Sequence, residues 1–164
     1  MSTIPDDSSL EKRVRALAAR LLEQGRRLAT AESCTGGWIA KCCTDQPGSS
    51  AWFERGFVSY SDAAKHDSLG VDAQVLQFAG AVSEAVVRQM AAGALAHSAA
   101  DVALAVTGIA GPDGGSEDKP VGTVWFAWDV AGTVESECMV FAGDRDAVRR
   151  QTVAHALDGL AARL

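Results

Sequence analysis

The chain has 164 residues, of which 48% are hydrophobic and 22% charged, and its formal net charge is −6. This composition excludes an intrinsically disordered protein, and the length is typical of a single domain with a core of its own. The excess of acidic side chains disfavours nucleic acid and anionic membrane surfaces as partners.

No run reaches the roughly 18 consecutive apolar residues of a membrane helix, and the polar residues 1–13 do not fit a secretory signal. We therefore expect a cytoplasmic protein with no membrane contact, in which residues 1–7 form a disordered tail. Four cysteines and three histidines show none of the paired spacings of zinc or iron–sulfur sites. The sequence thus predicts reduced thiols, no metal and no cofactor.

Helix and strand signals alternate along the first half of the chain. The motif Ser8-Ser9-Leu10-Glu11 fits a capping box, and apolar residues recur at helical spacing until Gly25. The predicted elements are, in chain order, a helix over 8–25, a short buried strand over 28–31, a helix from about 36 to 45, a strand over 52–60, and short helical pieces over 61–78 that break at Gly70.

The second half is predicted to begin and end in a helix. Ser83 is expected to cap a helix that continues through Ala94. The elements that follow are a strand over 101–106, a loop over 107–120, two strands over 121–130 and 135–141 that form a hairpin around Ala131-Gly132, and a helix from Asp144 to the end. This order predicts an α/β fold, a three-layer α/β/α sandwich with a mixed, mostly parallel sheet.

The loop after the first predicted strand has the composition of a reactive site. Ligands of such sheets bind outside the carboxyl ends of the strands, and Thr30-Ala31-Glu32-Ser33-Cys34-Thr35-Gly36-Gly37 places small polar side chains there. Backbone amides of Thr35, Gly36 and Gly37 could receive a phosphate or an oxyanion beside Ser33. Alternatively, Ser33 only caps the helix.

The loop over 107–120 is a second candidate for ligand binding. Thr107 begins it, and its glycines, Gly108 and Gly111 among them, allow the backbone to approach a ligand closely. The pattern fits neither a P-loop nor a dinucleotide fingerprint, so it identifies no nucleotide class. The alternative is a plain surface loop, although loops of this length are more often functional than short ones.

A serine nucleophile needs a base, and lysine is the better candidate here because no histidine lies in a loop of catalytic character. Lys65 closely follows the predicted strand over 52–60, and partial burial could lower its pKa from about 10.4 to roughly 7–8. Tyr60 could hydrogen-bond this pair or simply place a hydrated hydroxyl at the surface. Cys34 is the competing nucleophile, because a helix N-terminus lowers a thiol pKa.

The last predicted helix opens with Gly143-Asp144-Arg145-Asp146. Acidic residues there favour the helix dipole, and Arg145 could direct its guanidinium to a phosphate or carboxylate. The alternative is that these are solvated surface side chains.

Five ordered blocks of the chain resemble the CinA C-terminal domain family, over roughly residues 8–164. The blocks are Thr30 to Gly37, Gly80-Ala81-Val82-Ser83-Glu84, Gly108 to Gly115, Lys119-Pro120-Val121-Gly122-Thr123-Val124 and Gly143-Asp144-Arg145. Five blocks in order are far more specific than any single glycine-rich loop. Within the family, the chain is most similar to the stand-alone nicotinamide-nucleotide amidohydrolases.

The resemblance implies a metal-independent amidohydrolase that converts nicotinamide mononucleotide to nicotinate mononucleotide and ammonia, and a homodimer. It implies Ser33 as the nucleophile, with Tyr60 and Lys65 as its basic partners. The chain departs from the family's Tyr-Ser-Asn pattern at Asp62, a change of polarity near Lys65.

With these roles, the Thr35 to Gly37 amides are expected to bind the oxyanion. The substrate's 5′-phosphate is expected at Arg145 and the loop that contains Thr107, Gly108 and Gly111. Two other interpretations stay open. One is a non-catalytic nucleotide-binding regulatory protein of the competence- or damage-inducible kind, and the other is an enzyme that uses Cys34.

Overall fold

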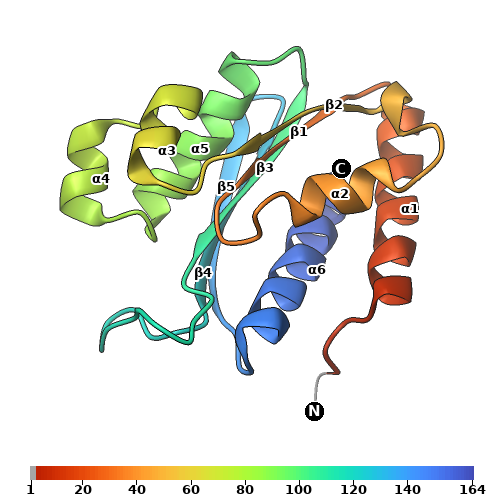
Figure 1. The fold of residues 1–164 in the computed structure, drawn as a ribbon. Coiled ribbons are helices and arrows are strands. Elements are labelled where there is room, and N and C mark those ends of the chain that lie inside the picture. Colours follow the sequence, from red (N-terminus) through yellow and green to blue (C-terminus); the bar gives the residue numbers. More distant parts are fainter. Residues whose placement is uncertain (1–2) are drawn as a thin grey trace.

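The computed structural model describes residues 3–164, and five strands in this range form one sheet in the order β2-β1-β3-β4-β5 (Figure 1). The strands are β1 (Leu28–Glu32), β2 (Phe53–Val58), β3 (Val102–Gly108), β4 (Thr123–Val130) and β5 (Thr133–Val140). β1 pairs in parallel with β2 and β3, whereas β4 is antiparallel to β3 and β5. The sheet is mixed as predicted, but its strand pairs divide evenly between parallel and antiparallel because β4 reverses direction. "Mostly parallel" therefore holds for strand direction, in which only β4 is reversed, but not for the pairing.

Helices pack on both faces of this sheet (Figure 1). On one face lie α1 (Asp7–Gln24), α2 (Trp38–Thr44) and α6 (Arg145–Arg163); on the other lie α3 (Asp62–Leu69), α4 (Ala73–Ala79) and α5 (Glu84–Ala96). A short 3-10 turn, η1 (Ser49–Ala51), precedes β2. Among residues 3–164, no helix is both long and apolar enough to cross a bilayer.

The two faces of the sheet differ in side-chain size. Successive residues of a strand point to opposite faces, and the central strands use this alternation. The face toward α5 carries Ala29, Ala31, Ala103, Ala105 and Ala127. The face toward α1 and α6 carries Leu28, Val102, Leu104, Val106, Phe126 and Trp128. Burial of each large apolar side chain contributes about 1.5–3 kcal/mol, so the α1 and α6 side holds the heavier core.

The first helix begins slightly earlier than predicted. Asp6 rather than Ser8 is the N-cap, because its carboxylate accepts a hydrogen bond from the Ser9 amide at 2.7 Å. Residues 1 and 2 of the expected tail lie outside the described residues, whereas Asp6 and Asp7 belong to the start of α1. The predicted helix stops at Gly25 and Gly70 and the predicted β4–β5 hairpin are confirmed.

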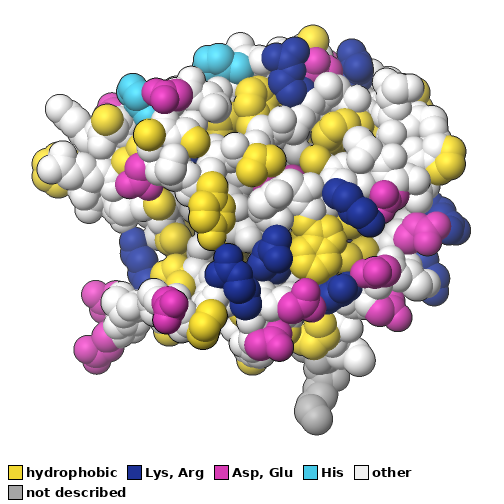
Figure 2. Space-filling model, viewed as in Figure 1, with side chains coloured by type: hydrophobic (Ala, Val, Ile, Leu, Met, Phe, Trp, Pro, Cys, Tyr) yellow, Lys and Arg dark blue, Asp and Glu magenta, His cyan; other side chains and the backbone are white. Residues whose placement is uncertain are grey.

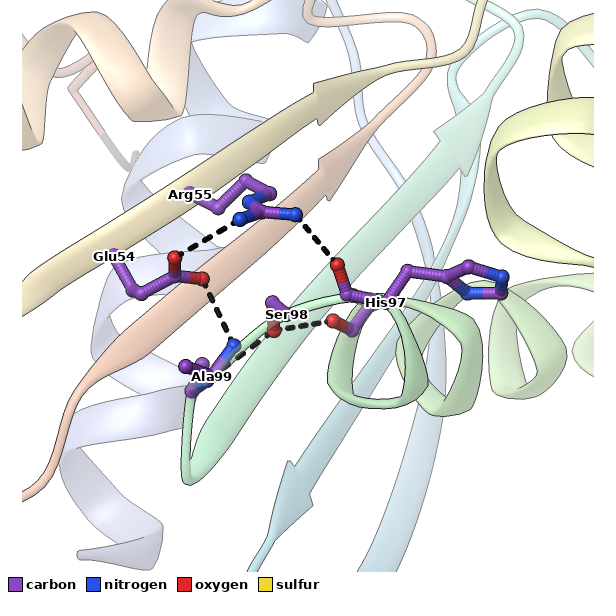
Figure 3. A network of polar contacts seen from close by, with 7 residues as sticks. Glu54, Arg55, His97, Ser98 and Ala99 are labelled. Carbon is purple, nitrogen blue, oxygen red and sulfur yellow. Dashed lines mark hydrogen bonds and ion pairs between the residues drawn. The ribbon is translucent and has the colours of Figure 1, made fainter.

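A polar network fixes the edge strand β2 to the turn between α5 and β3 (Figure 3). Arg55 Nη1 donates to the His97 carbonyl at 2.7 Å, and Glu54 Oε2 accepts from the Ala99 amide at 3.2 Å. The two side chains also pair with each other at 3.3 Å. β2 leads directly into the segment 59–60, and Tyr60 lines the cavity described next.

Candidate active site

The carboxyl ends of the parallel strands β2, β1 and β3 meet at one edge of the sheet, where a cavity of about 150 Å³ opens. This is where open α/β sheets bind ligands. Its lining consists of Ser33, Cys34, Tyr60, Lys65, Ala81, Val82, Thr107, Gly108, Ala110 and Arg145. The structure thus brings together most of the predicted site residues, whereas Thr35, Gly36, Gly37 and Gly111 lie outside the lining.

Ser33 and Lys65 are in direct contact in this cavity. The Nζ of Lys65 lies 2.9 Å from the Oγ of Ser33, and it also lies within hydrogen-bond distance of the Ser59 carbonyl at 2.9 Å and the Tyr60 carbonyl at 3.2 Å. Lys65 is only 1% exposed and Ser33 only 7%. The amine therefore has three polar neighbours and almost no access to bulk water.

Lys65 reaches Ser33 because α3 begins immediately after β2. Ser61 caps α3 by accepting a hydrogen bond from the Ala64 amide at 3.0 Å, and the Lys65 amide donates to the Ser61 carbonyl at 3.1 Å. Side chains in a helix lean toward its N-terminus. Lys65, in the first turn, is thereby directed back toward the strand ends.

Burial lowers the pKa of Lys65 below its ordinary value, while the carboxylate of Asp62 acts in the opposite direction. Burial disfavours the charged form of an amine. A neutral amine has two hydrogens and one lone pair. The two carbonyls can accept both hydrogens, which leaves the lone pair for the hydroxyl of Ser33.

Ser33 lies in a tight turn between β1 and α2. Its amide donates to the Val106 carbonyl at 3.2 Å, and its carbonyl accepts from the Gly36 amide at 3.0 Å. Gly36 and Gly37 have φ values of 60° and 98°, which residues with a side chain rarely adopt. α2 starts at Trp38, two residues later than predicted, and its N-cap is Gly37. The interpretation of Ser33 as a helix cap is therefore wrong.

Glu32 is the residue that sequence reasoning missed. Its fully buried carboxylate accepts hydrogen bonds from Thr35 Oγ1 at 2.6 Å, the Ile39 amide at 2.9 Å and the Ala40 amide at 3.0 Å. Burial raises the pKa of Glu32, and these hydrogen bonds act in the opposite direction. The Glu32 carboxylate thus occupies two amides near the start of α2, those of Ile39 and Ala40. The only sequence signal was one acidic residue at the end of an otherwise uncharged buried strand.

The neighbouring thiol of Cys34 is a poor nucleophile in this position. Burial, with a further contribution from the Glu32 carboxylate, raises the pKa of Cys34 to about 12. The lowered pKa expected from the helix start was therefore wrong. Since the thiolate is the reactive form of cysteine, almost all of Cys34 is unreactive near neutral pH.

Arg145 and Tyr60 form the mouth of the cavity. Arg145 donates through Nη1 to the Gly111 carbonyl at 2.7 Å and through Nη2 to the Tyr60 hydroxyl at 3.2 Å. Tyr60 is 63% exposed, and only its backbone carbonyl contacts Lys65. Its hydroxyl thus belongs to the mouth, beside Arg145.

Thr107 and Gly108 form the cavity wall at the end of β3. Thr107 is buried and donates through Oγ1 to the Ala81 carbonyl at 2.9 Å. A Cβ on Gly108 would lie 2.7 Å from Val124 Cγ2. The packing of β3 against β4 therefore requires a glycine here, independently of any ligand.

Basic and acidic side chains together surround hydrophobic ones on the face that carries α2 and the N-terminal part of α6 (Figure 2). A larger hollow of about 610 Å³ between α1 and α2 is lined by ion-paired groups, among them Lys41 with Asp45 at 2.7 Å and Arg15 with Glu11. Within residues 3–164, no group of three or more His, Cys, Asp or Glu side chains is placed to hold a metal ion. The smaller cavity, with its buried Ser33 and Lys65, is the candidate active site.

The fold and the site together define an α/β protein with a buried serine–lysine pair at the carboxyl ends of its parallel strands. Residues 10–164 match the CinA C-terminal domain, and the chain belongs to this family.

Two curated relatives and one solved structure illustrate the similarity. The chain is 56% identical over 157 residues to the nicotinamide-nucleotide amidohydrolase PncC of Escherichia coli (strain K12), with 94% of each chain covered. It is 57% identical over 151 residues to the protein of the same name from Pseudomonas putida, covering 90% of this chain and 94% of the relative. The crystal structure of the competence/damage inducible protein CihA from Agrobacterium tumefaciens matches with a TM-score of 0.92 and 46% identity, covering 99% and 98% of the two chains.

Proposed function

We propose that this protein is a nicotinamide-nucleotide amidohydrolase, which converts nicotinamide mononucleotide and water to nicotinate mononucleotide and ammonia. The observation that carries the proposal is the environment of Lys65, whose buried Nζ has two backbone carbonyls and the Ser33 hydroxyl within 3.2 Å. The likeness to the two PncC proteins supports the choice of substrate.

In the proposed mechanism, the neutral amine of Lys65 takes the proton of the Ser33 hydroxyl as Oγ attacks the carboxamide carbon. The tetrahedral intermediate collapses when the Lys65 ammonium returns this proton to the amide nitrogen, and ammonia leaves. Lys65, neutral again, takes a proton from a water molecule that attacks the acyl ester. Breakdown of the second intermediate gives the carboxylate product and restores the Ser33 hydroxyl.

The oxyanion needs a donor close to Ser33. We assign this role to the Cys34 amide, because Cys34 lines the cavity and, within residues 3–164, its N–H has no backbone acceptor. The Gly36 amide, expected from the sequence to contribute, instead donates to the Ser33 carbonyl.

The cavity is smaller than the about 300–1,000 Å³ of a typical drug-sized ligand site. We therefore place only the carboxamide and pyridine ring inside it, against Thr107 and Gly108. The ribose and 5′-phosphate then lie at the mouth. Arg145 is placed to bind the phosphate there, since a guanidinium forms paired hydrogen bonds with phosphate oxygens.

Ser33→Ala and Lys65→Arg are expected to lower kcat by about 10³-fold or more. The first removes the nucleophile, and in the second a guanidinium cannot give up its proton to act as a base. The measurement is ammonia release from nicotinamide mononucleotide, with and without a chelator. Cys34→Ala is the matched control and is expected to stay within about 10-fold of the wild type, because the thiol is protonated.

Full activity of Ser33→Ala in a folded protein would eliminate Ser33 as the nucleophile. Loss of ammonia release in Cys34→Ala, with Ser33→Ala still active, would favour the mechanism that uses Cys34 as the nucleophile. Calorimetric binding of the nucleotide without any product over hours would favour the non-catalytic, nucleotide-binding interpretation. We also propose that the protein is a cytoplasmic homodimer, and light scattering on the purified protein tests the oligomeric state.

A further inference from the structure

The turn formed by residues 33–37, here called the nucleophile turn, is held from two sides. On the inner side the Glu32 carboxylate accepts hydrogen bonds from the Thr35 hydroxyl and from the Ile39 and Ala40 amides of α2. On the outer side Arg149 of α6 donates through Nε to the Cys34 carbonyl and through Nη2 to the Thr35 carbonyl, both at 3.1 Å. The Thr35 carbonyl also accepts from the Trp38 amide at 3.1 Å, whereas Arg149 is the hydrogen-bond donor that joins the Cys34 and Thr35 carbonyls.

We propose that Arg149 is a positioning residue for the reaction, because it fixes the two peptide units that set the direction of the Cys34 amide beside Ser33. The inference rests on the proposed function, in which Ser33 attacks and the Cys34 amide receives the oxyanion.

The effect passes through a chain of peptide groups. The carbonyl and N–H of one peptide unit point in opposite directions, so a fixed Thr35 carbonyl also fixes the Gly36 N–H. The Gly36 N–H donates to the Ser33 carbonyl at 3.0 Å. That bond in turn fixes the Ser33–Cys34 peptide, and with it the Cys34 N–H. Arg149 thereby orients a group that it does not touch.

The guanidinium is itself well held. Its central carbon lies 5.3 Å from the centre of the Trp38 ring, and a Cβ on Gly36 would lie 3.6 Å from Nη2. Arg149 also lies four residues after Arg145, on the same side of α6. One helix thus contacts both the mouth of the cavity and the nucleophile turn.

Arg150 is a natural control for this role. It lies next to Arg149 on α6, and its guanidinium is 4.9 Å from the same Trp38 ring. Its hydrogen bonds, however, go to Asp146 at 2.9 Å and Asp7 at 2.7 Å. It therefore shares the charge and the aromatic contact of Arg149 without any hydrogen bond to the nucleophile turn.

The test compares Arg149→Met and Arg149→Lys with Arg150→Met. Two rates are measured: kcat for ammonia release, and the rate at which a neutral fluorophosphonate labels Ser33, with Ser33→Ala as the blank. A neutral probe separates positioning from long-range attraction of the anionic substrate. Arg149→Met is expected to lower both rates by about 10- to 100-fold, because small misplacements of reacting groups cost about this much. Arg149→Lys is expected to recover only part of the loss, since one ammonium cannot reproduce two fixed donors.

Arg150→Met is expected to change both rates by less than about 3-fold, and urea unfolding confirms that each variant is folded.

Chemical rescue provides a second readout. Millimolar guanidinium chloride, but not sodium chloride, is expected to restore part of the rate in Arg149→Ala. Labelling of Arg149→Met and Arg149→Lys at the wild-type rate would overturn the inference, as would equal losses in Arg149→Met and Arg150→Met. A wild type that is labelled at Ser33 but releases no ammonia would refute the proposed substrate, while the difference between the arginine variants would still test the positioning role.

Discussion

At the scale of single residues, the protonation of Lys65 is set by two opposing influences. Burial lowers the pKa of Lys65, whereas the exposed carboxylate of Asp62, three residues earlier in α3, raises it. Since the proposed base must be neutral, activity should rise with pH through the pKa of Lys65. At low pH, Asp62 therefore favours the protonated form of Lys65, which cannot act as a base.

Asp62→Asn is expected to shift the acidic limb of the kcat/KM profile toward lower pH. Removal of the carboxylate eliminates a charge that favours the ammonium form, so Lys65 becomes neutral at a lower pH. Asp67→Asn, on the same helix, is the control and should leave the limb in place. A shift toward higher pH in Asp62→Asn would contradict the assignment of this limb to Lys65.

The key pair of the site could be predicted from residue types, because a small polar loop and one well-placed lysine were enough to select Ser33 and Lys65. The role of Glu32 could not be predicted in this way. Its partners, the amides of Ile39 and Ala40, lie seven and eight residues away and reach it only through the left-handed turn at Gly36 and Gly37. The direction of those amides is a property of the folded turn, which is why residue types alone did not reveal that Glu32 binds them.

At the scale of elements, β2 is an edge strand that pairs only with β1 within residues 3–164. The segment that follows it supplies the Ser59 and Tyr60 carbonyls to Lys65. Edge strands have one unpaired side and need other contacts to stay in place. The Glu54 and Arg55 network in Figure 3 provides such contacts.

Glu54→Ala is expected to lower the free energy of unfolding by about 1 kcal/mol, because the Ala99 amide loses a charged hydrogen-bond acceptor and Arg55 keeps only its bond to the His97 carbonyl. Urea denaturation measures the change. Glu11→Ala is the control, since it breaks an exposed pair with Arg15 on α1 that is worth only about 0.3–0.5 kcal/mol. Equal effects in the two variants would show that the network does not anchor β2.

Most element positions followed from periodicity and stop residues, and the differences have local causes. α2 begins late because Gly36 and Gly37 have φ values of 60° and 98°, which lie outside the right-handed helical region. The balance of parallel and antiparallel pairs was misjudged because strand order is a long-range property. A hairpin signal reveals that β4 and β5 pair, but not that β4 also lies beside β3.

At the scale of the whole molecule, charge acts on the substrate in two ways. The net charge of −6 repels an anionic substrate at long range. Acidic and basic side chains are interspersed on the face that carries α2 and the start of α6 (Figure 2), but the charged side chain at the mouth of the cavity is the cationic Arg145. Attraction at short range therefore opposes repulsion at long range.

The KM for nicotinamide mononucleotide is expected to fall with added salt. The Debye length falls from about 30 Å at 0.01 M to about 8 Å at 0.15 M, which screens the long-range repulsion from the net negative charge, whereas the contact between Arg145 and the 5′-phosphate is shorter than either length. Nicotinamide riboside lacks the phosphate and keeps the positively charged pyridinium ring, so the KM of this control substrate should instead rise with salt. Initial rates at constant pH measure both, and Arg145→Met should raise the KM for the mononucleotide at every salt concentration. A KM for nicotinamide mononucleotide that rises with salt would indicate that attraction by Arg145 dominates.

The reacting pair and the residue at the cavity mouth come from separate stretches of the chain. Ser33 and Lys65 are 32 residues apart on neighbouring strand–helix units, whereas Arg145 belongs to the C-terminal helix. Substitutions in the first turn of α6, ahead of Arg149, are therefore expected to alter which acidic group binds at the mouth, while the proposed proton transfer between Ser33 and Lys65 is preserved. Evolution could redirect such a protein to a new metabolite through a few surface positions, without rebuilding its reaction centre.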